Sequence, residues 1–324
     1  MTQAAAVAQY LTTAAFVALG VAVAYRWYRQ PSRAQGMLAL ALITLAAVAL
    51  IGRFQSPTNP SPVLAFISVV AFLASGYFVL LFRNEFIPLG RRTRIAANVL
   101  LGVSIVVGFL DTFVFARADP FVLTVILLEL IGAWAIFTGE PIIRFWLASN
   151  TLPAVQRARM RFLSGGFAVL IVVLFASVLA RSALQNPTAG LITQLIVLAI
   201  VPAIYVSFAP PSLLRRIWRM SEENEVRAAM QDLLIFSPNR QALAERAVYW
   251  AVRLMGASAG FVTDADGRVL AMYGIDADRA SNLAAGSSGE DVIVAPLHLT
   301  EGQGTLAIVA GRFTPVFGAD RSRR

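Results

Sequence analysis

Two carboxylates lie inside stretches of sequence that are otherwise long and apolar. Glu129 is near the middle of the run TVILLELIGAW, and Asp111 is near the end of another run. An ionisable side chain is costly to place in hydrocarbon, so such a residue is by default a candidate for a signal or relay site. In the alternative interpretation, the carboxyl only makes a hydrogen bond to a neighbouring helix. The sequence leaves both interpretations open for Glu129 and for Asp111.

Missing residue types exclude several kinds of chemistry. The chain has no cysteine and no lysine, and His298 is its only histidine. Disulfides, thiolate nucleophiles and a retinal Schiff base are therefore excluded. Without histidine in the apolar half, we expect neither haem nor a serine protease in the membrane. His298 falls on an expected strand and is interpreted as structural. We therefore predict no catalytic, cofactor-binding or metal-binding residues, and no cofactor.

Long apolar segments must position the two carboxylates. Hydrophobic residues make up 58% of the chain and charged residues only 14%, with a mean hydropathy of +0.70, whereas soluble domains carry roughly 25% charged residues. A membrane-spanning helix needs about 20 mostly apolar residues. Residues 1–210 are therefore predicted to form an all-α transmembrane bundle of about seven helices, over residues 5–25, 37–53, 63–82, 95–115, 121–138, 162–180 and 191–208.

The arginines predict the orientation of this bundle. Alternate connections carry most of them: Arg26, Arg29, Arg33, Arg83, Arg91, Arg92, Arg94, Arg144, Arg157, Arg159, Arg161, Arg215, Arg216 and Arg219. The other connections carry only Arg53, Arg117 and Arg181. Basic loops face the cytoplasm, so we expect the N-terminus outside and the C-terminus inside. The first ten residues carry no basic residue, so a cleaved signal peptide is not expected.

A juxtamembrane segment is predicted over residues 211–237. Pro202, Pro210 and Pro211 mark the junction after the seventh helix, where a signal would pass. An apolar stripe then recurs at helical spacing: Val226, Ala229, Met230, Leu233 and Leu234. One stripe on an otherwise polar helix needs a partner, either a second subunit or the following domain. We expect a homodimer that pairs through Val226, Met230 and Leu233.

The spacing of the apolar residues changes within residues 238–324, from a helical to a strand-like pattern. A helix is predicted to start at Ser237-Pro238, with proline at its first position. AGFVTDADGRVLAMYG then indicates a hairpin with an Asp-Gly turn. DVIVAPLHL and TLAIVAG indicate a second hairpin, joined by the turn residues TEGQG. A helix followed by two hairpins makes a small α+β domain with an antiparallel sheet.

Two parts of this region resemble a GAF domain. SPNRQALAERAVYWAVRLMGASAGFVTDADGRVLAMYG is similar to its opening helix and first hairpin, and VIVAPLHLTEGQGTLAIVAGRFTPVFGAD to its closing strands. Seven helices, a short helical linker and a GAF domain resemble the input half of bacterial membrane sensor histidine kinases. Only GIDADRASNLAAGSSGE joins the two hairpins. The resemblance therefore implies a minimal GAF-like domain, and we do not expect it to bind a ligand of GAF domains.

These patterns lead to one functional expectation and two alternatives. We expect a membrane-bound sensor or receptor module in a two-component-type pathway of a bacterium, in the inner (plasma) membrane. Its expected partners are the lipid bilayer, a second copy of the chain and a separate kinase or other output protein. No nucleic-acid partner is expected, and no enzyme activity from the chain as it stands. The alternatives are a transporter or channel subunit with a regulatory domain, and a membrane-anchored scaffold.

Overall fold

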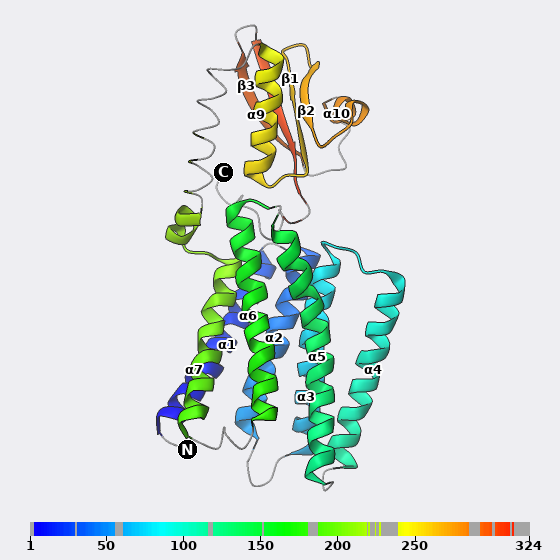
Figure 1. Ribbon diagram of the computed structural model, residues 1–324, viewed down its shortest axis with the longest axis vertical. Helices are drawn as coiled ribbons and strands as arrows, with labels where there is room; N and C mark the ends of the chain where they lie inside the picture. The colour runs from blue at the N-terminus through cyan, green and yellow to red at the C-terminus, as the bar shows by residue number, and fades with distance from the viewer. Residues whose placement is uncertain are drawn as a thin grey trace. The chain divides into compact units, whose positions relative to one another are not determined.

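A computed structural model describes most of the chain (Figure 1). The described residues are 3–29, 31–55, 61–115, 119–150, 152–180, 187–218, 220, 224, 227, 239–284, 292–299, 302–311 and 313. Contacts within the chain define two compact units, one formed by 1–147 with 161–209 and the other by 148–160 with 210–324.

Within the part of the chain that the structure describes, seven helices are long and apolar enough to cross a membrane. Even their shortest apolar span has 21 residues, about 30 Å of helix, which matches the hydrocarbon thickness of a bilayer. The predicted number of spans is therefore confirmed. The helices are α1 (Gln3–Arg29), α2 (Arg33–Phe54), α3 (Pro62–Asn84), α4 (Arg91–Phe113), α5 (Pro120–Ser149), α6 (Ala154–Leu179) and α7 (Pro187–Phe208).

The surface of the helices is apolar, which identifies lipid as their solvent. Large aliphatic side chains such as Val106 and Val172 are 57% and 66% exposed. Soluble monomers rarely expose this many large apolar side chains on helices of this length. The chain is therefore a multi-pass membrane protein.

Close approaches between helices occur at particular glycines. A Cβ on Gly108 of α4 would lie 2.7 Å from Val69 of α3, and one on Gly166 of α6 would lie 2.9 Å from Ile204 of α7. Small residues let membrane helices approach to this degree. A Cβ on the adjacent Gly165 would instead meet no atom within 4 Å. A polar contact also joins α1 and α7, because the guanidinium of Arg26 donates a hydrogen bond to the carbonyl of Phe208 at the end of α7.

Helices α5 and α6 differ most from the sequence-based boundaries. The apolar run predicted a fifth span ending at residue 138, whereas α5 continues to Ser149, through Pro141. The extension is packed: Phe145 is only 2% exposed, and its ring lies 5.5 Å from that of Phe82. This burial offsets the loss of a backbone hydrogen bond at the proline. On the following helix, α6 begins at Ala154, ahead of residue 162.

The second unit contains a small antiparallel sheet. Its elements are α9 (Arg240–Met255), β1 (Ala259–Thr263), β2 (Val269–Tyr273), α10 (Ala277–Ala284), β3 (Val292–Leu299) and β4 (Gly302–Val309). The strand order is β2-β1-β4-β3, and each neighbouring pair is antiparallel. The predicted pair of hairpins and the predicted sheet are therefore confirmed.

Each face of the sheet is packed against one helix. Val248 and Val252 of α9 cover Val262 and Ala271 on one face. Gly260 permits this packing, because a Cβ there would lie 2.7 Å from Val252. On the other face, α10 supplies Ala280, which packs on Phe261 and Ala307. All five residues of β1 are buried, because its side chains alternate between two faces that are each covered by a helix.

Three local details differ from the sequence prediction. The helix predicted from Ser237-Pro238 is α9, and it begins at Arg240, because the side chain of Asn239 accepts a hydrogen bond from the N–H of Ala242 and serves as its N-cap. Residues 302–304, expected in a turn, belong to β4, because Gly302 pairs with Leu299. The short connector between the hairpins also forms a helix, α10.

Candidate functional site: polar contacts along helix α5

Glu129 is held by a hydrogen bond from another helix. The hydroxyl of Ser104 on α4 donates to Oε1 of Glu129 on α5 over 2.8 Å. Hydroxyls in membrane helices commonly bond to a carbonyl of their own preceding turn, as Thr112 does to Gly108. Ser104 instead reaches across to α5, and it is completely buried. The predicted candidate Glu129 therefore joins two helices inside the apolar part of the protein.

The second oxygen of Glu129 has a different environment. Glu129 Oε2 is buried and has no hydrogen-bond partner among the residues that the structure describes. A buried polar atom without a partner costs about 1–3 kcal/mol, so natural proteins retain one only where something else compensates. Glu129 thus has one oxygen bonded to Ser104 and one buried oxygen that meets no donor among the described residues.

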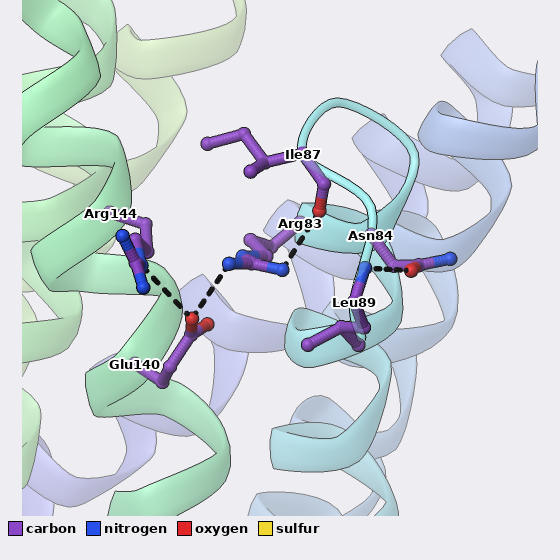
Figure 2. Close-up of polar contacts among 6 residues, drawn as sticks. All are labelled: Arg83, Asn84, Ile87, Leu89, Glu140 and Arg144. Carbon is purple, nitrogen blue, oxygen red and sulfur yellow. Dashed lines mark hydrogen bonds and ion pairs between the residues drawn. The ribbon is translucent and has the colours of Figure 1, made fainter. Parts of the chain in front are cut away.

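A second polar cluster lies further along α5 and was not found by sequence analysis (Figure 2). Glu140 Oε1 lies 2.8 Å from a terminal nitrogen of Arg83, which belongs to α3 and is only 4% exposed. The other terminal nitrogen of Arg83 donates to the carbonyl of Ile87 over 2.8 Å. Arg144, mostly exposed, lies 3.4 Å from the same Glu140 oxygen. The Arg83–Glu140 pair therefore joins α3, its following turn and α5.

The missed cluster left a weak trace in the sequence. Glu140 and Arg144 are four residues apart, the spacing at which opposite charges meet on one helix face. The third apolar run ends at residue 82, so the sequence predicts Arg83 in a cytoplasmic connection, whereas it is the penultimate residue of α3. Nothing in the sequence pairs Arg83 with Glu140, because their contact depends on the packing of two helices far apart in the chain.

The segment between the two carboxyls is tightly packed against α3. Trp134 is completely buried, and its indole N–H donates to the hydroxyl of Ser75 over 2.9 Å. Its ring is stacked on Phe72, with centroids 5.1 Å apart. Gly76 makes room for it, because a Cβ there would lie 2.8 Å from the indole. The α3–α5 seam, defined here by Phe72, Ser75, Gly76 and Trp134, therefore fixes the two helices in one register.

Glu129 and Glu140 lie on the same side of α5. They are eleven residues apart in sequence, which is about three turns, or about 16 Å along the axis. With 3.6 residues per turn, their directions differ by only about 20°. Helix α5 thus carries two acidic side chains in line, one contacting α4 and one contacting α3.

The other predicted candidates lie elsewhere. Asp111 is half-buried near the end of α4, seven residues after Ser104, which places it about 10 Å along that helix from the Ser104–Glu129 bond. The stripe of Val226, Met230 and Leu233 lies outside the described residues, as do Ala229 and Leu234. Backbone pairing places His298 opposite Gln303. Among the residues described, no three histidine or acidic side chains gather into a group that could hold a metal ion.

Fold and contacts together define the class of protein. It is a multi-pass membrane protein with seven membrane-capable helices, followed by a small antiparallel α+β unit. Comparison with protein-family models, with curated proteins and with solved structures finds no match to this chain. Inference about function therefore rests on the residues themselves.

Proposed function

We propose that the chain is a membrane-bound sensor module that passes a signal from the membrane or its outer face to a small cytoplasmic domain. The observation that supports this most directly is the carboxyl of Glu129. One of its oxygens is fixed by Ser104, and the other is buried without a partner among the described residues. A group in this state changes its interactions when a signal arrives, and a conformational change needs such a difference between states.

The proposed signal path runs through helices that contact one another. From Glu129 the path runs along α5 to the α3–α5 seam, and then through α2 and α1, which pack in sequence order, to α7. Arg26 of α1 contacts the last turn of α7, directly ahead of Pro210 and Pro211. The following domain, which resembles a GAF domain in its opening helix and hairpins, would receive the change. A separate kinase or other output protein is the proposed recipient.

Substitution of Glu129 tests this role. Glu129→Gln keeps an acceptor for Ser104 but removes the carboxylate, so the full chain in lipid nanodiscs should show altered backbone hydrogen exchange in α7 and in α9, neither of which contains Glu129 or Ser104. Thr112→Val, which removes a hydrogen bond made within α4 alone, is the matched control and should leave α7 and α9 unchanged. Changes confined to α4 and α5 would favour the structural interpretation of Glu129 and overturn the signalling role.

The orientation is part of the proposal. The arginine bias predicts that the connection before α7 faces outside and the segment after α7 faces the cytoplasm. Reporter fusions placed after Asn186, ahead of α7, and after Arg219 should therefore give opposite signals in a bacterial cell, with only the second active in the cytoplasm. Signals from the same side at both positions would contradict a spanning α7 and with it the proposed orientation.

The proposed active form is a homodimer that pairs through the linker. Two copies in one membrane plane meet at high effective concentration, and burying a few apolar side chains at roughly 1.5–3 kcal/mol each is then sufficient for pairing. Because the chain has no cysteine, single cysteines introduce no background. Met230→Cys or Leu233→Cys should form an intermolecular disulfide under mild oxidation, whereas Gln231→Cys should not. Equal cross-linking at all three positions would reject the pairing.

The transporter alternative makes a different prediction from the same residue. If Glu129 coupled ion or substrate movement, Glu129→Gln would abolish a flux across sealed proteoliposomes. If the chain is a sensor, neither the wild type nor the variant should show a flux. A flux that depends on Glu129 would therefore replace the sensor function with transport.

A further inference from the structure

The short helix that follows α7 presents an exposed apolar face. Backbone residues 212–218 and 220 are helical, and the N–H of Arg215 bonds to the carbonyl of Pro211. Leu213, Ile217 and Met220 are 67%, 52% and 55% exposed. Their spacing of four and then three residues puts them on one side of a helix, within about 60° of one another. We refer to this segment, residues 212–220, as the post-α7 helix.

Arg215 lies opposite this apolar face, and Arg216 lies at its edge on the side of Met220. At 100° per residue, Arg215 and Arg216 point about 160° and 60° away from Leu213, and Arg216 is exposed. No acidic residue occurs between Phe208 and Met220. An apolar face beside a purely basic one is typical of a helix that lies in the interface of a bilayer, with its arginines among anionic headgroups.

The chain itself limits where this helix can be. Only Ala209, Pro210 and Pro211 separate Ser212 from Phe208, the last residue of α7. Four steps of chain reach at most about 14 Å. If α7 spans the bilayer, the post-α7 helix starts within the headgroup layer or at its edge, whatever the position of the small domain.

The charge of the side chains changes from positive to negative immediately after this helix. Ser221 is followed by Glu222, Glu223 and Glu225, which an anionic surface repels. Basic residues therefore hold the chain at the membrane up to Met220, and acidic residues direct it away from there.

We infer that the post-α7 helix is a binding site for anionic phospholipid headgroups, with Leu213, Ile217 and Met220 inserted among the acyl chains and Arg215 and Arg216 contacting phosphate groups. This inference goes beyond the proposed sensor function, because it holds for any protein with this membrane part. It makes the path from α7 to the small domain dependent on the lipid. Each arginine contributes roughly fivefold to the equilibrium for lying on an anionic surface.

The experiment uses the full chain in bilayers that contain a spin-labelled quencher lipid. Ile217→Cys carries an environment-sensitive fluorophore on the apolar face, and Ser212→Cys carries the same fluorophore on the polar face. Membranes of phosphatidylcholine with phosphatidylglycerol are compared with phosphatidylcholine alone. Both leaflets carry the same lipid, so the result does not depend on the orientation of the chain or on its function in signalling.

The expected result is strong quenching at position 217 and weak quenching at 212 in the anionic membrane. Quenching at 217 should fall in phosphatidylcholine alone, and it should fall similarly in the anionic membrane when Arg215 and Arg216 are both changed to Gln. A label at 217 that is unquenched in the anionic membrane would overturn the inference, since the small domain or a second subunit would then cover this face. Equal quenching in both membranes would overturn the assignment of the arginines to headgroups.

Discussion

Glu140→Gln is expected to lower the free energy of unfolding by about 3 kcal/mol. The substitution leaves Arg83 buried without its counter-charge, and breaking a buried ion pair from one side typically costs 3–5 kcal/mol. The low end applies because the Glu140 side chain is 31% exposed. The measurement is reversible unfolding of the purified protein in mixed detergent micelles, followed by tryptophan fluorescence.

Two further variants distinguish the contribution of the buried Arg83–Glu140 pair from that of the exposed Arg144–Glu140 contact. Arg144→Gln removes the contact of a side chain that is 59% exposed, so it should change stability by no more than about 0.5 kcal/mol. The combined change Arg83→Met with Glu140→Leu removes both charges, and apolar groups of similar volume often replace a buried pair without loss. The double variant should therefore be more stable than Glu140→Gln alone. Equal losses in Glu140→Gln and Arg144→Gln would show that burial of Arg83 is not important for stability.

Gly76→Ala should destabilise the bundle by about 1–3 kcal/mol, the usual cost of forcing a methyl group into a filled site. The new Cβ would lie 2.8 Å from Cδ1 of Trp134. The indole cannot give way easily, because it is completely buried, stacked on Phe72 and bonded to Ser75. Thermal denaturation in detergent gives the direct comparison.

The matched control for this substitution is Gly139→Ala on α5. A Cβ at Gly139 meets no atom within 4 Å, so the added methyl group displaces nothing. Alanine also favours the helix over glycine by up to about 1 kcal/mol. Gly139→Ala should therefore keep or slightly raise the stability. A loss of similar size in both variants would mean that the α3–α5 seam is not the cause.

Long-period features of the sequence predicted the architecture well. Seven apolar runs matched seven helices, because spanning a bilayer imposes length and composition on every span. The first hairpin was predictable from Asp266-Gly267, where glycine has a φ of +79° and so adopts the left-handed conformation at no steric cost. These signals are local, and they act without knowledge of the rest of the chain.

The candidate site was predictable only in part. Glu129 was conspicuous because its neighbours in the sequence are apolar, but its partner Ser104 was not, since nothing local indicates which hydroxyl turns toward another helix. Glu140 was missed for a different reason. It lies past residue 138, where the apolar run ends, and beside Pro141, which by itself predicts the end of a helix. The packing of Phe145 against α3 carries α5 past both signals.

The eleven-residue separation of Glu129 and Glu140 has a mechanical consequence. Eleven residues make about three turns of a straight helix, so side chains at this spacing differ in direction by only about 20°. Twisting α5 about its own axis therefore swings both carboxyls through the same angle, away from Ser104 at one level and from Arg83 at the other. Because the α3–α5 seam lies between the two carboxyls, such a rotation would also have to displace Trp134 from Ser75 and Phe72.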